Sequence, residues 1–115
     1  MESQQTHPAD SIADRFIVVM VTTASEVEAQ GIATALVNEG LAACVNFREV
    51  QSIYRWKGDT CHSREWHLFI KTKSAKFDAL GARIQALHPY DVPEIIAVPI
   101  VRGAQTYLDW LDQET

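Results

Sequence analysis

The apolar residues of this chain change their spacing several times, and the order of these changes constrains the fold more than any other feature. Runs rich in β-branched residues, or alternating in polarity, predict strands, whereas apolar residues three and four apart predict helices. Strands are predicted at residues 16–23, 41–56, 65–72 and 95–101, and helices from Ser25 to Gly40, from Ser74 to Pro89 and after Gly103. This β-α-β-β-α-β order with a short terminal helix predicts a ferredoxin-like α+β fold, an antiparallel sheet with two helices on one face.

Residues at the ends of these segments predict where the helices begin and end. Ser25 and Glu28 fit a capping box, in which a hydroxyl and a carboxylate accept hydrogen bonds from free amides of the first turn. Gly40 is expected to end that helix. For the second helix, Ser74 is the predicted cap and Pro89 the end, because proline cannot continue a helix.

The second and third predicted strands form a long hairpin. Charged residues at 48–49 interrupt the apolar pattern and predict a bend or bulge, and turn-forming residues predict a loop over 57–63. Pro99 indicates an edge position or a bulge for the fourth strand, since proline donates no ladder hydrogen bond. The helices cover only one sheet face, so the other face, with residues such as Phe69 or Trp66, is expected to mediate self-association.

Length and composition bound the class of protein. The 115 residues, 47% hydrophobic and 22% charged, predict a single domain at 15–115 that follows a mobile tail at 1–14. A net charge of −5 argues against nucleic acid as a partner. No apolar run approaches the ~20 residues of a membrane span and no signal peptide is visible, so we expect a cytoplasmic protein with no membrane partner. Cys44 and Cys61 are too few for a disulfide scaffold.

The densest group of chemically active side chains is the run His88-Pro89-Tyr90-Asp91-Val92-Pro93-Glu94-Ile95, where a helical pattern gives way to a strand. Its prolines restrict the backbone, so the polar side chains can be held in a fixed geometry. His88 could bind copper or zinc, with Glu94 or Asp91 adding oxygen ligands. His88 could instead cap the helix, whose last carbonyls are unpaired. The sequence leaves both roles open.

Other candidate ligands and catalytic groups are sparse. Cys61 and His62 are adjacent, with His67 five residues further on, and this set fits either a soft-metal site or incidental surface residues. The sequence has no nucleophile elbow, no phosphate-binding glycine loop and no zinc-protease histidine pair. We therefore expect no enzymatic activity and no organic cofactor.

Several motifs together resemble the CutA divalent-cation-tolerance family over about residues 16–111. They are Ala42-Ala43-Cys44-Val45-Asn46, Ser52-Ile53-Tyr54-Arg55-Trp56-Lys57-Gly58, Glu65 six residues before Lys71-Thr72, the run from His88 to Ile95, and Gly103 with Tyr107-Leu108-Asp109-Trp110. The resemblance implies a cytoplasmic homotrimer that takes part in the response to metal ions and binds Cu(II) or another divalent ion weakly.

Within this resemblance, His88 is the leading metal ligand and Glu94 the second. Thr22 and Leu87 stand where members with proposed copper ligation carry Cys and His, so only His88 of that ligand set is kept.

The resemblance also implies a cleft between subunits, lined by Lys71, Tyr54, Trp56, Tyr90 and Glu94. An ammonium, a carboxylate and a phenol between aromatic walls suit a small anionic or zwitterionic ligand, although the same side chains could simply join the subunits. The alternative function is therefore a signalling or small-ligand-binding trimer similar to the nitrogen-regulatory PII proteins. A third possibility is an interaction scaffold without a ligand.

Overall fold

The computed structural model of the protein describes residues 12–115. The predicted mobile tail, residues 1–14, therefore lies almost wholly outside the described residues. Its last three residues belong to a single helical turn, α1 (Ile12–Arg15), which leads directly into the first strand.

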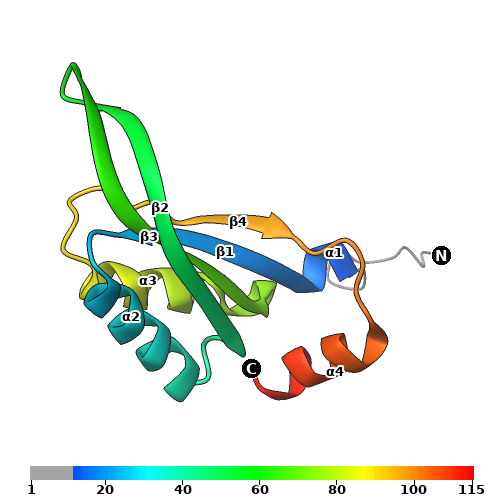
Figure 1. Cartoon of the computed structure of the whole chain (residues 1–115). Helices are drawn as coiled ribbons and strands as arrows, with labels where there is room; N and C mark the ends of the chain where they lie inside the picture. The colour runs from blue at the N-terminus through cyan, green and yellow to red at the C-terminus, as the bar shows by residue number, and fades with distance from the viewer. Residues whose placement is uncertain (1–11) are drawn as a thin grey trace.

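Four antiparallel strands form one sheet: β1 (Phe16–Thr23), β2 (Cys44–Trp56), β3 (Asp59–Lys73) and β4 (Ile96–Pro99). Their order across the sheet is β2-β3-β1-β4 (Figure 1). Two helices, α2 (Glu26–Asn38) and α3 (Phe77–Leu87), alternate with the strands as predicted, which confirms the ferredoxin-like α+β fold. The edge position predicted for Pro99 is confirmed as well, because β4 is the last strand of the sheet in residues 12–115 and pairs with β1.

One face of the sheet packs against α2 and α3 and forms the hydrophobic core (Figure 1). Since side chains alternate along a strand, Val19 and Val21 of β1 and Leu68 and Ile70 of β3 all point to this face and are fully buried. Trp66 packs against the same core, which corrects the expectation that it lies on the free face. The helices contribute the buried side chains Ala29, Ile32, Leu36, Leu80 and Ile84.

The ends of α2 are fixed by the predicted residues. The Ser25 hydroxyl accepts a hydrogen bond from the Glu28 amide (3.1 Å), and the Glu28 carboxylate accepts one from the Ala24 amide (3.2 Å). At the other end, Gly40 has a φ of 72°, and its amide and the amide of Leu41 bond back to carbonyls of the last turn. This arrangement is a Schellman motif, so both predicted ends are confirmed.

Helix α3 begins differently from the prediction. Ser74–Lys76 form a turn of 3₁₀ helix, η2, and α3 follows from Phe77 without a capping side chain. Ser74 is therefore not the cap, because the tighter turn moves the start of the α-helix three residues along the chain. The end of α3 agrees with the prediction, since the helix stops at Leu87, two residues before Pro89.

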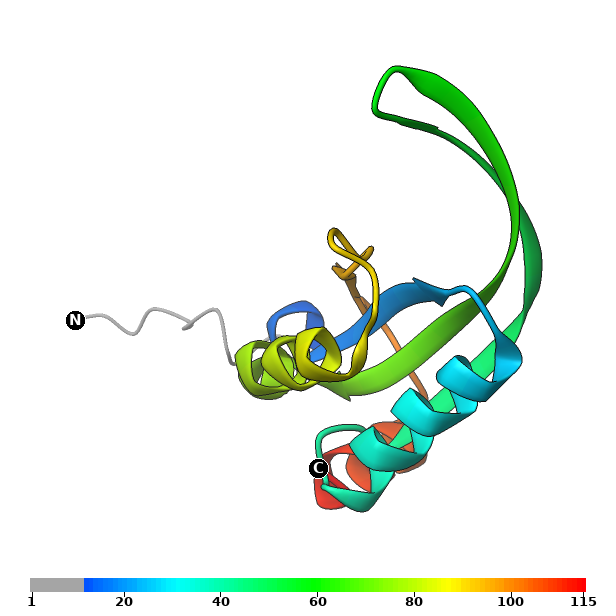
Figure 2. The same ribbon diagram turned by 90° about the vertical axis from the view of Figure 1, so that its left-hand side faces the viewer.

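Strands β2 and β3 form a hairpin that extends beyond the rest of the sheet and curves away from it (Figure 2). Their pairing is unbroken from Cys44 opposite Lys71 to Trp56 opposite Asp59. The bulge, one of the two alternatives predicted near residues 48–49, is therefore wrong, because charged residues at the exposed part of a hairpin do not require a break in its ladder. The other alternative, a bend, is compatible with the curved hairpin (Figure 2).

The two strands are connected by Lys57 and Gly58 alone, with φ values of 51° and 86°. Two consecutive positive φ values are the geometry of a type I′ turn, whose twist matches that of the strands. The predicted loop over 57–63 is therefore wrong: this turn uses two residues, and β3 begins at Asp59.

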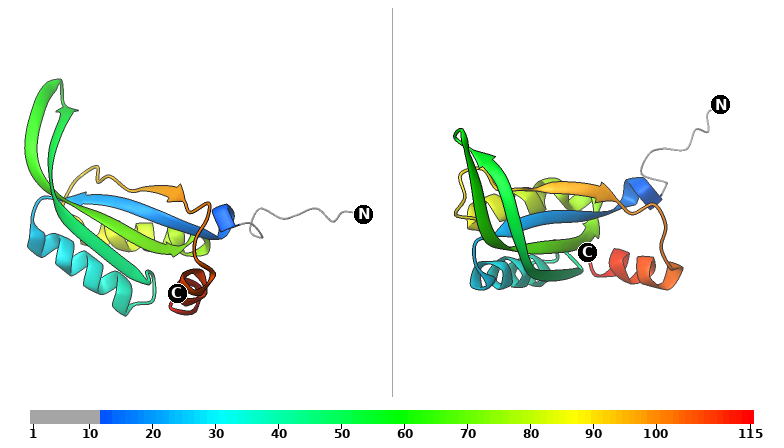
Figure 3. Two further views of the ribbon diagram at one scale, coloured as in Figure 1. Left: turned by 45° about the vertical axis from the view of Figure 1, so that its right-hand side comes forward. Right: turned by 45° about the horizontal axis from the view of Figure 1, so that its top comes forward.

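The second face of the sheet is covered at one end only. There Phe16 packs against Leu108 and Leu111 of α4 (Gln105–Gln113), which lies beside the start of β2 and the end of β3 (Figure 3). The remainder has no helix over it within residues 12–115, and we call it the open face. Its apolar side chains, identified by alternation and strand pairing, are Val18, Met20, Phe69, Ile96 and Val98. No helix among the described residues is long and apolar enough to span a membrane.

Candidate functional site

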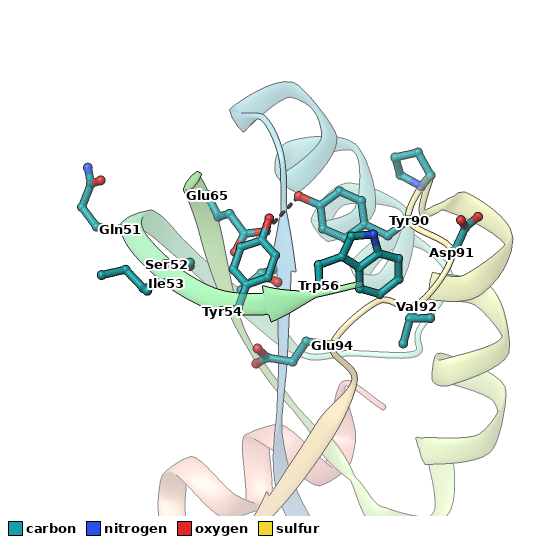
Figure 4. A pocket seen from close by; sticks show the side chains of 12 residues that line it. Gln51, Ser52, Ile53, Tyr54, Trp56, Glu65, Tyr90, Asp91, Val92 and Glu94 are labelled. Atoms are coloured by element: carbon teal, nitrogen blue, oxygen red, sulfur yellow. Dashed lines mark hydrogen bonds between the residues drawn. The ribbon is translucent and has the colours of Figure 1, made fainter. Parts of the chain in front are cut away.

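A cleft of about 770 Å³ lies between the hairpin and the segment that joins α3 to β4 (Figure 4). The segment supplies Pro89, Tyr90, Asp91, Val92 and Glu94, and the strands supply Thr22, Gln51, Ser52, Ile53, Tyr54, Trp56 and Glu65. Helix α3 ends at Leu87, and the two prolines that follow keep the segment from continuing as a helix. The run singled out in the sequence is therefore one wall of the cleft.

Three aromatic side chains stand around this cleft. Tyr54 and Trp56 are two residues apart on β2, so both project from the same side of the hairpin. Tyr90 reaches toward them from the opposite wall (Figure 4). The Tyr54 hydroxyl lies 2.9 Å from the Ser63 hydroxyl across the hairpin, which fixes the orientation of that ring.

Tyr90 is held by a carboxylate that sequence analysis did not assign to the site. Its hydroxyl donates a hydrogen bond of 2.8 Å to the carboxylate of Glu65, a residue that is only 6% exposed (Figure 4). Burial, followed by the hydrogen bond and the negative charge of Glu65, raises the pKa of Tyr90 well above its ordinary value. An acidic residue within an alternating strand, directly before a tryptophan, is the sequence signal that could have marked Glu65.

His88 is 7% exposed, and both of its ring nitrogens have protein partners. Nδ1 accepts a hydrogen bond from the Tyr90 amide (3.2 Å), so Nε2 carries the proton and donates to the carbonyl of Thr22 (2.6 Å). The ring also packs against the ring of Tyr90, with centroids 4.6 Å apart. His88 occupies the C-cap position of α3, but its side chain ties the helix end to β1 rather than to the helix carbonyls.

Glu94, the second predicted metal ligand, pairs with a different histidine. Its carboxylate lies 3.5 Å from Nε2 of His67, an atom that is buried and has no hydrogen-bond partner among the described residues. In residues 12–115, no group of three or more His, Cys, Asp or Glu side chains is placed to share a metal ion. A tightly held resident metal does not fit these donors, since stable sites use about four ligands. The roles of His88 and Glu94 as weak metal ligands stay predictions.

The remaining candidate residues are spread over the hairpin. Lys71 donates a hydrogen bond to the side chain of Asn46 and is not part of the cleft lining, so its place in a cleft between subunits stays a prediction. Cys61 and His62 are neighbours on β3, and their side chains therefore point to opposite faces. His62 bonds to Gln51 (3.0 Å) instead. One ion cannot be held by this adjacent pair in the observed strand.

Comparison with known proteins gives a consistent assignment. The sequence model of a family described as CutA1 divalent ion tolerance protein matches residues 17–114. A divalent-cation tolerance protein CutA of Thermus thermophilus is 50% identical over 99 residues, which cover 85% of this chain and 96% of that protein. A CutA protein of Archaeoglobus fulgidus is 38% identical over 95 residues, covering 83% and 93% of the two chains.

Solved structures agree with the sequence comparisons. The crystal structure of CutA1 from Oryza sativa has a TM-score of 0.86 at 40% identity and covers 91% of this chain and 97% of that one. The structure from Thermus thermophilus has a TM-score of 0.85 and covers 87% and 98%. The chain spans a smaller part of some relatives, such as 59% of the chloroplastic protein CutA of Arabidopsis thaliana.

Proposed function

The chain belongs to the CutA1 divalent ion tolerance family, and from this premise we propose that it takes part in the response to divalent metal ions as a homotrimer. The proposed role is one of binding and not of catalysis. A location in the cytoplasm stays a prediction from the sequence.

The observation that supports self-association is the open face. Its apolar side chains include Ile96 and Val98, which are 52% and 39% exposed in the single subunit. An apolar sheet face of this kind is typical of an interface, because a monomer would leave it in contact with water. The curved hairpin extends past the sheet, where it can reach a neighbouring subunit (Figure 2).

We propose that Cu(II) binds to this protein weakly and reversibly, with His88 and Glu94 as ligands. The weakness has a physical reason in the hydrogen bonds of His88. To free a ring nitrogen, His88 must give up a bond to Thr22 or Tyr90, each worth about 1 kcal/mol. Glu94 lies at the surface of the cleft and can accept a cation with less rearrangement.

Calorimetric titration of the purified protein with Cu(II) tests this ligand assignment. His88→Gln and Glu94→Gln should each reduce the heat of binding and the affinity, whereas His62→Gln, on the exposed part of the hairpin, should leave both unchanged. Isotherms of the first two variants that coincide with the wild-type isotherm would remove these residues from the site. Copper tolerance itself is measured by growth of a host that lacks its own relative, with and without this chain.

The cleft favours a second function, the binding of a small organic ligand, as in the PII-like alternative. A concave site with aromatic walls and a few polar groups is the usual form of such sites. The two functions differ in the effect of Lys71→Ala. If Lys71 takes part in a cleft between subunits, the variant should lose ligand binding but keep copper uptake.

A further inference from the structure

The charged residues that line the cleft are all acidic. Glu65, Asp91 and Glu94 contribute carboxyl groups, and no Lys or Arg side chain lines the cleft within the described residues. Lys71, the cation expected there, bonds to Asn46 outside the lining. Two groups beside the lining can carry a positive charge: the ammonium of Lys57, 5.7 Å from the centre of the Trp56 ring, and His67, beside Glu94. The carboxyl groups of the lining would therefore repel an anionic ligand, contrary to the expectation of an anionic or zwitterionic ligand.

The aromatic part of the lining also favours a positively charged ligand. The faces of Tyr54, Trp56 and Tyr90 carry the negative part of the aromatic quadrupole and attract cations, Trp most strongly. The three rings come from both walls of the cleft (Figure 4). A cation between the two walls would thus lie near aromatic rings on more than one side. It would share the Trp56 ring with the ammonium of Lys57, which lies 5.7 Å from the centre of that ring.

The ring of Tyr90 is held in place before any ligand arrives. Its hydroxyl is bonded to the buried carboxyl group of Glu65, its amide to His88, and its ring packs on the imidazole of His88. A wall fixed by three contacts loses little conformational freedom on binding, which favours affinity. The hydrogen bond from His88 to Thr22 extends this support to the central strand β1.

We propose that this cleft binds a small organic cation, a quaternary ammonium or alkylammonium group, between Trp56, Tyr54 and Tyr90, with Glu94 and Asp91 supplying the negative charge. This inference rests on the second function proposed above, small-ligand binding, and names the class of its ligand. An organic cation fits better than a metal ion, because aromatic faces are not metal ligands and no three donors converge within residues 12–115.

Three probes of nearly equal shape test the sign of the charge. Choline carries a trimethylammonium group, 3,3-dimethyl-1-butanol replaces its nitrogen by carbon, and 3,3-dimethylbutanoate carries a negative charge. Ligand-observed NMR titration of the whole chain, at low ionic strength, should show choline binding about tenfold more tightly than the neutral alcohol. The carboxylate probe should bind least, and added salt should weaken the binding of choline.

Matched variants locate the binding. Trp56→Leu and Glu94→Gln should each weaken choline binding by roughly fivefold. Trp110→Leu removes a tryptophan with nearly the same exposure on α4, and Glu49→Gln removes an ion-paired carboxylate outside the cleft, so both should leave the affinity unchanged. Light scattering of each variant checks that assembly is intact.

The outcomes separate the two proposals. Equal affinity for choline and the neutral alcohol, or preference for the anionic probe, overturns the cation assignment but leaves small-ligand binding standing. No binding of any probe overturns both. Equal losses in Trp56→Leu and Trp110→Leu place the choline elsewhere and overturn the assignment to the cleft.

Discussion

At the scale of single residues, the contact between Tyr90 and Glu65 joins the chemistry of the cleft to its stability. A buried carboxyl group is costly unless it has hydrogen bonds, and the Tyr90 hydroxyl supplies one at 2.8 Å. The same bond fixes the segment that follows α3 against the hairpin. One side chain pair therefore connects two parts of the chain that are 25 residues apart.

Tyr90→Phe should lower the free energy of unfolding by about 1–3 kcal/mol at pH 8, because Glu65 loses its donor while the ring is kept. Denaturation by urea at a fixed protein concentration measures this difference. Tyr107→Phe is the control, since Tyr107 also has a raised pKa from burial but no carboxylate among the causes of the shift.

The difference between wild type and Tyr90→Phe should also depend on pH. The pKa of Tyr90 is raised above 10.0 in the folded chain, so the folded state holds this proton more tightly than the unfolded state. The resulting stability is fully present below about pH 10 and is lost as the pH rises further. The difference should therefore stay constant up to about pH 10 and narrow above it, and a difference that stays constant or widens above pH 10 would contradict this account.

At the scale of elements, the two-residue turn of the hairpin decides where β2 ends and β3 begins. Gly58 has a φ of 86°, a conformation that costs other residues about 1–2 kcal/mol. Gly58→Ala should lower the free energy of unfolding by that amount although the added methyl group meets no atom within 4 Å.

Gly31→Ala provides the opposite case. Gly31 lies inside α2, its added methyl group also meets nothing within 4 Å, and alanine favours a helix by about 0.5–1 kcal/mol. Thermal unfolding of both variants should therefore move the Tm in opposite directions. A fall in both would mean that lost backbone freedom is not what separates the two sites.

The elements themselves could be predicted from the sequence because the apolar residues of each recur at a regular spacing. In most cases a capping or helix-breaking residue also marks where the element ends. Ser25 and Gly40 fixed α2 correctly, since their bonds are local. The turn at Lys57 and Gly58 was predicted, but as part of a loop that runs to residue 63, because Lys-Gly is a weaker signal of a two-residue turn than Asn-Gly. The prediction that Ser74 caps α3 was wrong because a serine can precede an α-helix or a 3₁₀ helix, and tertiary packing decides between the two.

The site was less predictable than the fold. Tyr54, Trp56, Tyr90 and Glu94 line one cleft within the subunit, whereas the predicted cleft lies between subunits and includes Lys71, so that cleft stays a prediction. The partners of His88 and Tyr90 come from β1 and β3, far away in the chain. No local pattern could reveal those contacts, so the bonding of both His88 nitrogens and the pairing of Glu65 with Tyr90 emerge only in three dimensions.

At the scale of the whole molecule, the open face should tolerate a charge only if the subunit stands alone. Val98 lies on edge strand β4 opposite Val18 and is 39% exposed. Val98→Glu should cost the single subunit little, but should break an apolar interface, where an unpaired charge is very costly. Val27→Glu, 80% exposed on α2, is the control and should assemble as the wild type does. Gel filtration makes this comparison: Val98→Glu should elute as a smaller species than Val27→Glu.

The most direct test of the proposed trimer is the mass of the wild-type protein in solution. Light scattering at micromolar concentration should return three times the 12.9 kDa of one subunit. A mass of 12.9 kDa would contradict the proposal, because the apolar open face would then be exposed to water in the native state.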